Sequence, residues 1–544
     1  MLGIARLVPP GSHPTTSRST MTSPAPRLRL RLRHLATGAA GGLLVALSLP
    51  PLGWWPAAWL GLAVVAFALP GLGAVERAWL GAGMGVTQFA IGLYWVQEFT
   101  IPGYLVLVLV SSLFVVAALV ATPSARRRCV VLGLPSALVL MEWARDRLPL
   151  NGFPLGSLAL GQASGPLVPS ARLGGSLGLI AVTAAAGVAI AELGHLGEAW
   201  WQYSGLRRPD AEAARRRADQ ALRRTAAGAV ALAVAVVAVP LAGLWSPGGQ
   251  AVRGGALKVA LIQGGGPRGT RAVDTDPQTV FERHLAASLS VSGPVDLAVW
   301  PEGMLQSSGS YEGTADAQAV ADEARRLGAT VVVGVEPTIA GGRYYNEAVA
   351  WGPDGTVVAT YRKNHLVPFG EYIPWRSLIQ RWFDVREVPL DGLPGHSAGF
   401  MDTPAAPLAV MISYEVFFDE RARGGVRAGG QLLVVPTNTA SYRGSQVPTQ
   451  ELAAAKIRSW ETGRWLLQVT PTGYSAVVTP NGAVVRRSSL GARAVLTATV
   501  LRRRGSTVYV VVGDGVLALA ALVGLAAAWG MARPWRRAGH EGPA

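Results

Sequence analysis

Cysteine, lysine and charged residues in general are scarce in this sequence of 544 residues. The single cysteine, Cys129, excludes an internal disulfide and a zinc site built from cysteines, and we interpret it as a small buried hydrophobic residue. Charged residues make up 15% of the chain, against roughly 25% in an ordinary soluble protein. Hydrophobic residues make up 50%. This balance indicates a membrane protein.

Arginine supplies nearly all of the positive charge, because lysine occurs only at Lys258, Lys363 and Lys456. The formal net charge is +16, which in a soluble domain would suggest a nucleic-acid partner. Here the arginines gather beside apolar segments. We therefore expect a membrane partner and no nucleic acid.

Eight apolar stretches approach or exceed the roughly 20 residues that a helix needs to cross a bilayer. They lie near residues 35–50, 54–69, 78–97, 101–121, 129–143, 176–198, 225–245 and 507–531. The first two are short and are joined by Pro50-Pro51-Leu52-Gly53, which favours a tight helical hairpin. One longer, kinked span is the alternative, and it would move every later loop to the opposite side of the membrane.

The distribution of arginine predicts the orientation in the membrane. With eight spans, one side receives Arg27, Arg29, Arg31, Arg33, Arg126 to Arg128, the 201–224 loop, Arg533, Arg536 and Arg537. The connections at 51–53 and 98–100 on the other side contain no Lys or Arg. The positive-inside rule then places both termini in the cytoplasm and residues 246–506 outside. Arg502 to Arg504 lie on the outer side and are an exception.

We expect five segments. Residues 1–34 form a disordered basic tail, with Met1 or Met21 as the start, and residues 35–245 form a helical membrane domain of about seven spans. Residues 246–506 form an extracytoplasmic domain, residues 507–531 a C-terminal transmembrane helix, and residues 532–544 a cytoplasmic tail.

The outer domain has the pattern of an α/β fold. Strands are expected at 257–263, 296–300, 330–335, 345–351, 357–361, 408–412, 431–435, 466–470 and 475–478, and helices at 278–291, 315–327 and 449–464. Polar clusters containing Glu302, Lys363 and Ser413 each follow an expected strand. Because sites in α/β sheets gather at the carboxyl ends of strands, we predict that these three residues converge on one pocket that opens toward the membrane.

Glutamate, lysine and serine in these positions suggest acyl transfer. A covalent route needs a nucleophile, a base and a group that stabilises the oxyanion. Glu302 can serve as the base and Ser413 as the nucleophile. Lys363 and a backbone N–H just after Ser413 can stabilise the oxyanion, and Glu371 can orient Lys363. Each residue alone is more often an ordinary loop or cap residue, so the hypothesis depends on the combination.

The combination resembles the nitrilase superfamily, whose triad is Glu-Lys-Cys on an αββα sandwich. The motifs are Trp300-Pro301-Glu302, Tyr361 to Pro374 with Lys363 and Glu371, and Ile412-Ser413-Tyr414-Glu415. With the flanking spans, the chain is similar to the apolipoprotein N-acyltransferase family. Further matches are Asn438, Gln450, the helix with Arg458, Glu461 and Arg464, and the stretch from Asn151 to Gly156.

The resemblance implies a multi-pass α-helical membrane domain joined to a nitrilase-like αββα domain. It implies a phospholipid acyl donor, a diacylglyceryl lipoprotein as acceptor of the acyl chain at its N-terminal amine, and no cofactor or metal. The catalytic residues would be Glu302, Lys363 and Ser413, and Glu371, Tyr414 and Glu415 would support them.

The sequence departs from the family at the nucleophile, because Ser413 stands where the family has cysteine. A thiol has a pKa near 8.5 and ionises readily beside a cation, whereas a serine hydroxyl needs a strong base. A second departure is the run from Gly264 to Thr270, which lacks the family's aromatic residue. Two alternatives therefore stay open, a non-catalytic scaffold that binds lipid, lipoprotein or a membrane enzyme, and a membrane-tethered amidase.

Overall fold

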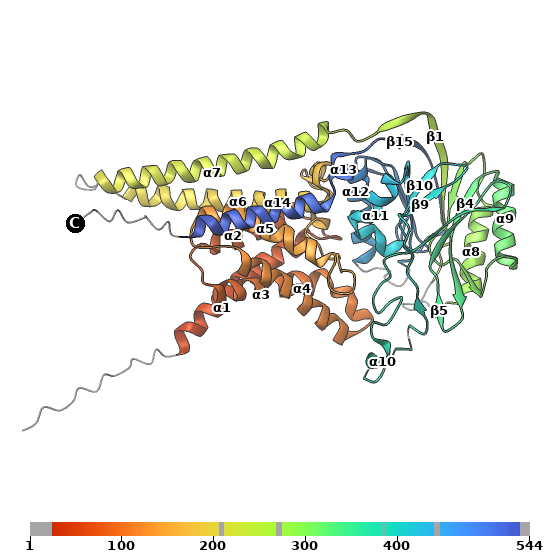
Figure 1. The fold of residues 1–544 in the computed structure, drawn as a ribbon, viewed down its shortest axis with the longest axis horizontal. Coiled ribbons are helices and arrows are strands. Elements are labelled where there is room, and N and C mark those ends of the chain that lie inside the picture. Colours follow the sequence, from red (N-terminus) through yellow and green to blue (C-terminus); the bar gives the residue numbers. More distant parts are fainter. Residues whose placement is uncertain are drawn as a thin grey trace, which may run out of the picture.

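The computed structural model describes residues 24–205, 212–267, 275–382, 385–386, 388–439 and 446–533. The described chain forms a helical region and an α/β domain that lie end to end along the long axis (Figure 1). The last long helix returns to the helical region after the α/β domain is complete (Figure 1). The expected fold class, a membrane-type helical region joined to a nitrilase-like α/β domain, is confirmed.

The helical region contains long helices at all eight apolar stretches. They are α1 (Pro24–Ser48), α2 (Trp55–Ala68), α3 (Ala74–Gly92), α4 (Ile101–Ala121), α5 (Arg127–Arg145), α6 (Ala171–Gly205), α7 (Glu212–Trp245) and α14 (Asp514–Ala532). Four described segments are long and apolar enough to cross a membrane, namely Ile101–Ala121, Val168–Trp201, Thr225–Trp245 and Asp514–Ala532. The chain is therefore a membrane protein.

Two helices extend further than the sequence suggested. Helix α1 begins at Pro24, inside the expected disordered tail 1–34, and continues without a break into the first apolar stretch. Most of the expected 201–224 loop is helical, because α6 ends at Gly205 and α7 begins at Glu212. Residues 1–23 and 206–211 lie outside the described chain. Cys129 is fully buried in α5, as predicted.

The described part of the α/β domain contains two sheets. The nine-stranded sheet has β1 (Gln250–Gln263), β2 (Leu297–Val299), β3 (Leu305–Ser308), β4 (Thr330–Ile339), β5 (Arg343–Tyr344), β6 (Glu347–Trp351), β7 (Val357–Arg362), β8 (Asp391–Gly392) and β15 (Ala494–Arg504). The six-stranded sheet has β9 (Phe400–Asp402), β10 (Pro407–Val410), β11 (Leu432–Pro436), β12 (Leu466–Val469), β13 (Ala476–Val478) and β14 (Val484–Arg487).

Parallel strands form the centre of each sheet, and antiparallel strands lie at the edges. In the first sheet β1, β2 and β4 run parallel, and β15 and β6 add antiparallel partners. In the second sheet β10, β11 and β12 run parallel between β9 and β13. The carboxyl ends of the central strands, where polar side chains follow, can therefore gather at one edge.

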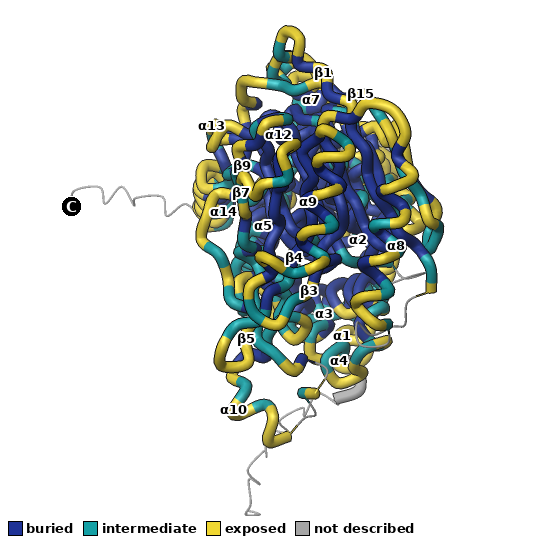
Figure 2. Tube along the Cα trace, turned by 90° about the vertical axis from the view of Figure 1, so that its right-hand side faces the viewer, coloured by how far each residue is buried: buried dark blue, intermediate teal, exposed yellow. Residues whose placement is uncertain are grey.

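Successive side chains along a strand point alternately into two different apolar layers. Val259 and Leu261 of β1 belong to the apolar core between the sheets, whereas Ala260 and Ile262 belong to the core under the outer helices. Those helices are α8 (Pro277–Leu289) and α9 (Ala315–Leu327), and the buried strands beneath them are dark in Figure 2. Helices α11 (Asp419–Arg427) and α12 (Val447–Thr462) cover the second sheet and face the helical region (Figure 1).

A buried polar seam joins the two regions where α6 is interrupted. Gly174 and Gly175 leave helical geometry, and Gly175 has φ +60°. The freed N–H of Ser176 donates to Asp419 Oδ2 at 2.9 Å. Arg458 of α12 donates to Ser176 Oγ at 2.6 Å, forms a close ion pair with Asp419, and lies 3.1 Å from Glu461 Oε2. This charge-assisted network fastens α12 to the helical region.

Candidate active site

Glu302 lies in a turn directly after the buried strand β2. The turn packs closely on β4, because a Cβ added to Gly334 would lie 2.4 Å from the Cα of Glu302. Gly334 N–H donates to Pro301 O at 3.0 Å, and Trp300 N–H donates to Val332 O at 2.8 Å. A side chain at position 334 would therefore displace the turn that presents Glu302.

Lys363 follows β7 directly and points into the same buried space. Its Nζ lies 2.8 Å from Glu302 Oε1 and 2.9 Å from Glu371 Oε2. Only 1% of the Lys363 side chain is exposed, and Glu302 is also buried. The structure thus brings together Glu302, Lys363 and Glu371, which are distant in sequence.

Asn346 completes this cluster, and sequence reasoning missed it. Its Nδ2 donates to Glu302 Oε1 at 2.7 Å and to Glu371 Oε1 at 2.8 Å, and its backbone carbonyl accepts from Lys363 N–H at 2.9 Å. Asn346 directly precedes β6, so a polar side chain at a strand start was the only signal in the sequence. Its contacts fix the spacing of the two carboxylates around the lysine.

The opposite charges in the cluster shift the pKa values of Lys363 and Glu371. Burial alone would lower the pKa of Lys363, but the carboxylates of Glu302 and Glu371 outweigh burial and raise that pKa above its usual value. Burial raises the pKa of Glu371 and Glu302 adds to this, while Lys363 opposes it. Lys363 is therefore a permanent cation at neutral pH, as oxyanion stabilisation requires.

Ser413 begins the short 3-10 helix Ser413–Phe417 after β10 and has φ +50°. This left-handed conformation is uncommon for serine and typical of a residue held by its surroundings. Glu415 holds it, since its carboxylate accepts from Ile412 N–H at 2.8 Å and from the N–H groups of Asn364 and His365 at 2.8 and 3.1 Å. The segment with Ser413 is thus bound to the residues that directly follow Lys363.

Tyr414 and Gln450 connect this site to the helical region. Tyr414 OH donates to Gly152 O at 3.0 Å. Gln450 of α12 accepts from Gly156 N–H at 3.1 Å and donates to Gly92 O at 3.0 Å. Arg145 holds the same stretch by donating to the carbonyls of Phe153 and Leu155 at 2.7 and 2.9 Å. The residue after Ser413 therefore contacts the membrane-side stretch from Asn151 to Gly156.

Glu451 is a further buried carboxyl beside the cluster, and no pattern in the sequence singled it out. Thr437 Oγ1 donates to Glu451 Oε1, and Thr437 O accepts from Glu302 N–H at 3.4 Å. Among the described residues, none donates to Glu451 Oε2. Burial raises the pKa of Glu451 to about 8. The Glu302 carboxylate adds to this increase, whereas the hydrogen bond from Thr437 and the charge of Lys363 oppose it. Glu451 is thus largely protonated at neutral pH.

We expect Glu451→Gln to remove a pH dependence of stability. A glutamate in the unfolded chain has a pKa near ~4.3, so between that pH and about 8 only the folded protein holds this proton. The stability linked to the proton is complete below pH ~4.3 and is lost as the pH rises through about 8, by up to a few kcal/mol. Denaturation temperatures of both proteins across this range measure it, with exposed Glu282→Gln as the control. Parallel curves for wild type and Glu451→Gln would contradict the expectation.

Two family models match the chain in the two regions described above. The Carbon-nitrogen hydrolase model matches residues 258–508, which include Glu302, Lys363, Glu371 and Ser413. The model of the Apolipoprotein N-acyltransferase N-terminal domain matches residues 41–189. The chain belongs to the apolipoprotein N-acyltransferase family.

Relatives in the apolipoprotein N-acyltransferase family match over most of the chain. The Geobacter metallireducens enzyme is 29% identical over 518 residues, which cover 91% of this chain and 94% of that relative. The Mycolicibacterium smegmatis enzyme is 27% identical over 504 residues, which cover 84% of this chain and 78% of the relative. An amidase from Nesterenkonia sp. is a structural neighbour with TM-score 0.34 and 21% identity, covering 50% of this chain and 98% of the amidase.

Proposed function

We propose that this protein transfers an acyl chain from a phospholipid to the N-terminal amine of a diacylglyceryl-cysteine lipoprotein. The observation that supports the proposal best is the buried Lys363 ammonium between the carboxylates of Glu302 and Glu371. A protein that only binds lipid does not require this arrangement. It places a base and a fixed cation next to the segment that holds Ser413.

The first half-reaction forms an acyl-enzyme. The Ser413 oxygen attacks the ester carbonyl of the phospholipid while Glu302 accepts the proton of the Ser413 hydroxyl. Lys363 and a backbone N–H after Ser413 stabilise the oxyanion. The carbon–oxygen bond to the glycerol breaks, and Glu302 returns the proton to the leaving alkoxide. The products are a Ser413 ester and a lysophospholipid.

The second half-reaction forms the amide. The α-amine of the lipoprotein cysteine attacks the Ser413 ester, and Glu302 accepts a proton from the attacking nitrogen. The intermediate collapses, the Ser413–acyl bond breaks, and Ser413 recovers its proton. The contact of Tyr414 with Gly152 supports lipid access from the helical side, because it places the serine segment against the membrane region.

Complementation with Glu302→Gln tests this function. The variant keeps the size of the side chain but removes the base, so we expect at least a ~100-fold loss of N-acylation. The measurement is mass spectrometry of lipoprotein peptides from a strain depleted of its own N-acyltransferase. Exposed Glu282→Gln is the matched control and should retain wild-type activity. Equal activity of Glu302→Gln and wild type would reject the proposed mechanism.

The proposed topology places the α/β domain outside the cytoplasmic membrane and both termini inside. Its support is the exposed arginine cluster Arg126 to Arg128 at the start of α5, next to Ser124 and Ala125, which lie beside the C-terminal end of α14. We expect reporter fusions at residues 225 and 540 to give a cytoplasmic signal and a fusion at 300 an extracytoplasmic one. A cytoplasmic signal at 300 would reverse the orientation.

A non-catalytic scaffold is the second candidate, and the serine in the nucleophile position favours it. The scaffold predicts that wild type acylates no lipoprotein, whereas the enzyme predicts measurable product that depends on Glu302. The same complementation experiment therefore separates the two candidates.

A further inference from the structure

A pocket lies at the end of the helical region that is far from the α/β domain. It has a volume of about 220 Å³ and is lined by Gly71, Leu72, Arg77, Pro123, Ser124, Ala125, Trp529 and Ala532. Trp529 and Ala532 end α14, whose first residue contacts Arg147 near the α/β domain. Helix α14 has 19 residues and is therefore about 28 Å long, so the pocket is remote from Lys363.

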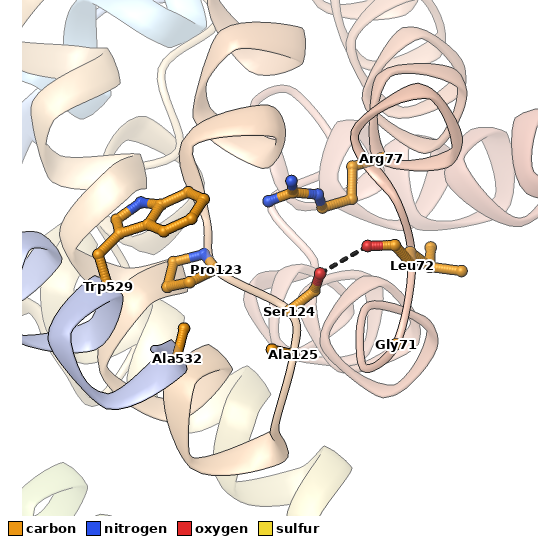
Figure 3. Close-up of a pocket in the computed structure, with 8 residues that line it drawn as sticks. All are labelled: Gly71, Leu72, Arg77, Pro123, Ser124, Ala125, Trp529 and Ala532. Carbon is orange, nitrogen blue, oxygen red and sulfur yellow. Dashed lines mark hydrogen bonds between the residues drawn. The ribbon is translucent and has the colours of Figure 1, made fainter. Parts of the chain in front are cut away.

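Arg77 is the functional group of this pocket. It is only 7% exposed, and its guanidinium points across the pocket toward Pro123 and Trp529 (Figure 3). Nε donates to Gly73 O at 3.4 Å and Nη1 donates to Thr122 O. Among the described residues no carboxylate pairs with Arg77, and none accepts a hydrogen bond from Nη2. A buried cation without a counter-charge is costly, so the pocket favours an anion.

The walls of the pocket are also held in place by polar contacts that do not involve the Arg77 side chain. Ser124 Oγ donates to Leu72 O at 2.6 Å (Figure 3). Gly71 N–H donates to Ser124 O at 2.7 Å. The Trp529 indole donates to Ala121 O at 2.8 Å. These bonds join the α2–α3 loop, the α4–α5 loop and the end of α14 into one preformed site.

The surroundings combine positive charge with apolar surface. Arg126, Arg127, Arg128 and Arg533 are exposed beside the pocket-lining residues. Leu72, Trp529 and Ala532 give the pocket an apolar wall, and Leu522 and Val523 of α14 are more than half exposed, as in a helix that faces lipid. Polybasic clusters at a membrane surface attract anionic lipids.

We propose that this pocket binds the headgroup phosphate of an anionic phospholipid, with Arg77 as the phosphate ligand. The phosphate accepts hydrogen bonds from the guanidinium, and the glycerol backbone lies against Trp529. A free phosphate ion has the same charge chemistry, but it would not use the apolar wall. The inference requires only that the helical region lies in a membrane, and it is independent of acyl transfer.

The test uses full-length protein in vesicles that contain phosphatidylglycerol with a photoactivatable headgroup. Crosslinked peptides are mapped by mass spectrometry. We expect crosslinks in the α4–α5 loop and near Trp529, reduced at least fivefold by Arg77→Gln. Ala125→Phe should reduce them similarly, because it fills the mouth and keeps Arg77. Arg486→Gln, an exposed arginine of β14, is the control and should leave them unchanged.

Competition identifies the source of the phosphate. Unlabelled phosphatidylglycerol should remove the crosslinks, whereas diacylglycerol and excess inorganic phosphate should not. Full competition by inorganic phosphate would show a free-anion site and overturn the lipid proposal. Competition by diacylglycerol, or crosslinks in folded Arg77→Gln and Ala125→Phe that equal wild type, would also overturn it. If Arg77→Gln does not fold, Ala125→Phe alone decides the outcome.

Discussion

Ser413→Cys should raise N-acylation at least about tenfold over wild type, which corresponds to about 1.4 kcal/mol of activation barrier. The thiol is far more acidic than the serine hydroxyl, and the proposed site sets the Lys363 ammonium beside it, which favours the ionised form of the thiol. A thioester is also a better acyl donor to an amine than an oxygen ester. The positive φ at Ser413 is not an obstacle, because cysteine differs from serine by one atom in the side chain.

Triacylated lipoprotein peptides in the depleted strain provide the measurement. Ser397→Cys places a thiol at an exposed position of the same domain and is the matched control, which should behave as wild type. Ser413→Ala should abolish turnover. If Ser413→Cys is inert while Ser413→Ala retains wild-type activity, Ser413 is not the acyl carrier. Absence of product from all the proteins would favour the scaffold.

Lys363→Met should abolish acylation and also destabilise the fold. Methionine fills a similar volume, but it leaves Glu302 and Glu371 buried without their cation. Loss of one partner of a buried charged cluster typically costs about 3–5 kcal/mol, and loss of an oxyanion donor costs about 10²–10³ in rate. A folded variant is expected to compensate by raising the pKa of one glutamate.

Lys258→Met is the natural comparison, because Lys258 is one of the three lysines and lies exposed on β1. It should retain wild-type activity and denaturation temperature. Combining Lys363→Met with Glu371→Gln should recover part of the lost stability without restoring activity. A Lys363→Met protein with wild-type acylation would remove Lys363 from the mechanism.

Sequence patterns located most central strands because those strands are short, buried apolar runs. The runs at β2, β10 and β11 end within two residues of the expected positions, and polar residues follow each. The edge strand β15 was missed, since an edge strand is partly exposed and lacks a continuous apolar run. Its antiparallel pairing with β1 depends on a contact between segments more than 200 residues apart.

The candidate site likewise contains residues that the sequence reveals and residues that it does not. Glu302, Lys363 and Ser413 stood out because each followed an apolar strand, a local signal. Asn346 and Glu451 gave no comparable signal, because their importance lies in contacts with residues distant in sequence. The left-handed conformation of Ser413 was equally hidden, since Glu415 imposes it through bonds to Ile412 and Asn364.

The seam at the interruption of α6 limits how the protein can be divided. Arg458, Asp419 and Glu461 are buried against the helical region, where Ser176 hydrogen-bonds to all three of them. A soluble fragment of residues 246–506 would expose these charges and the apolar side chains around them. Grafting the α/β domain onto the helices of a relative would require the seam residues of both regions to be transferred together. A substitution on one side of the seam therefore needs a matching substitution on the other side.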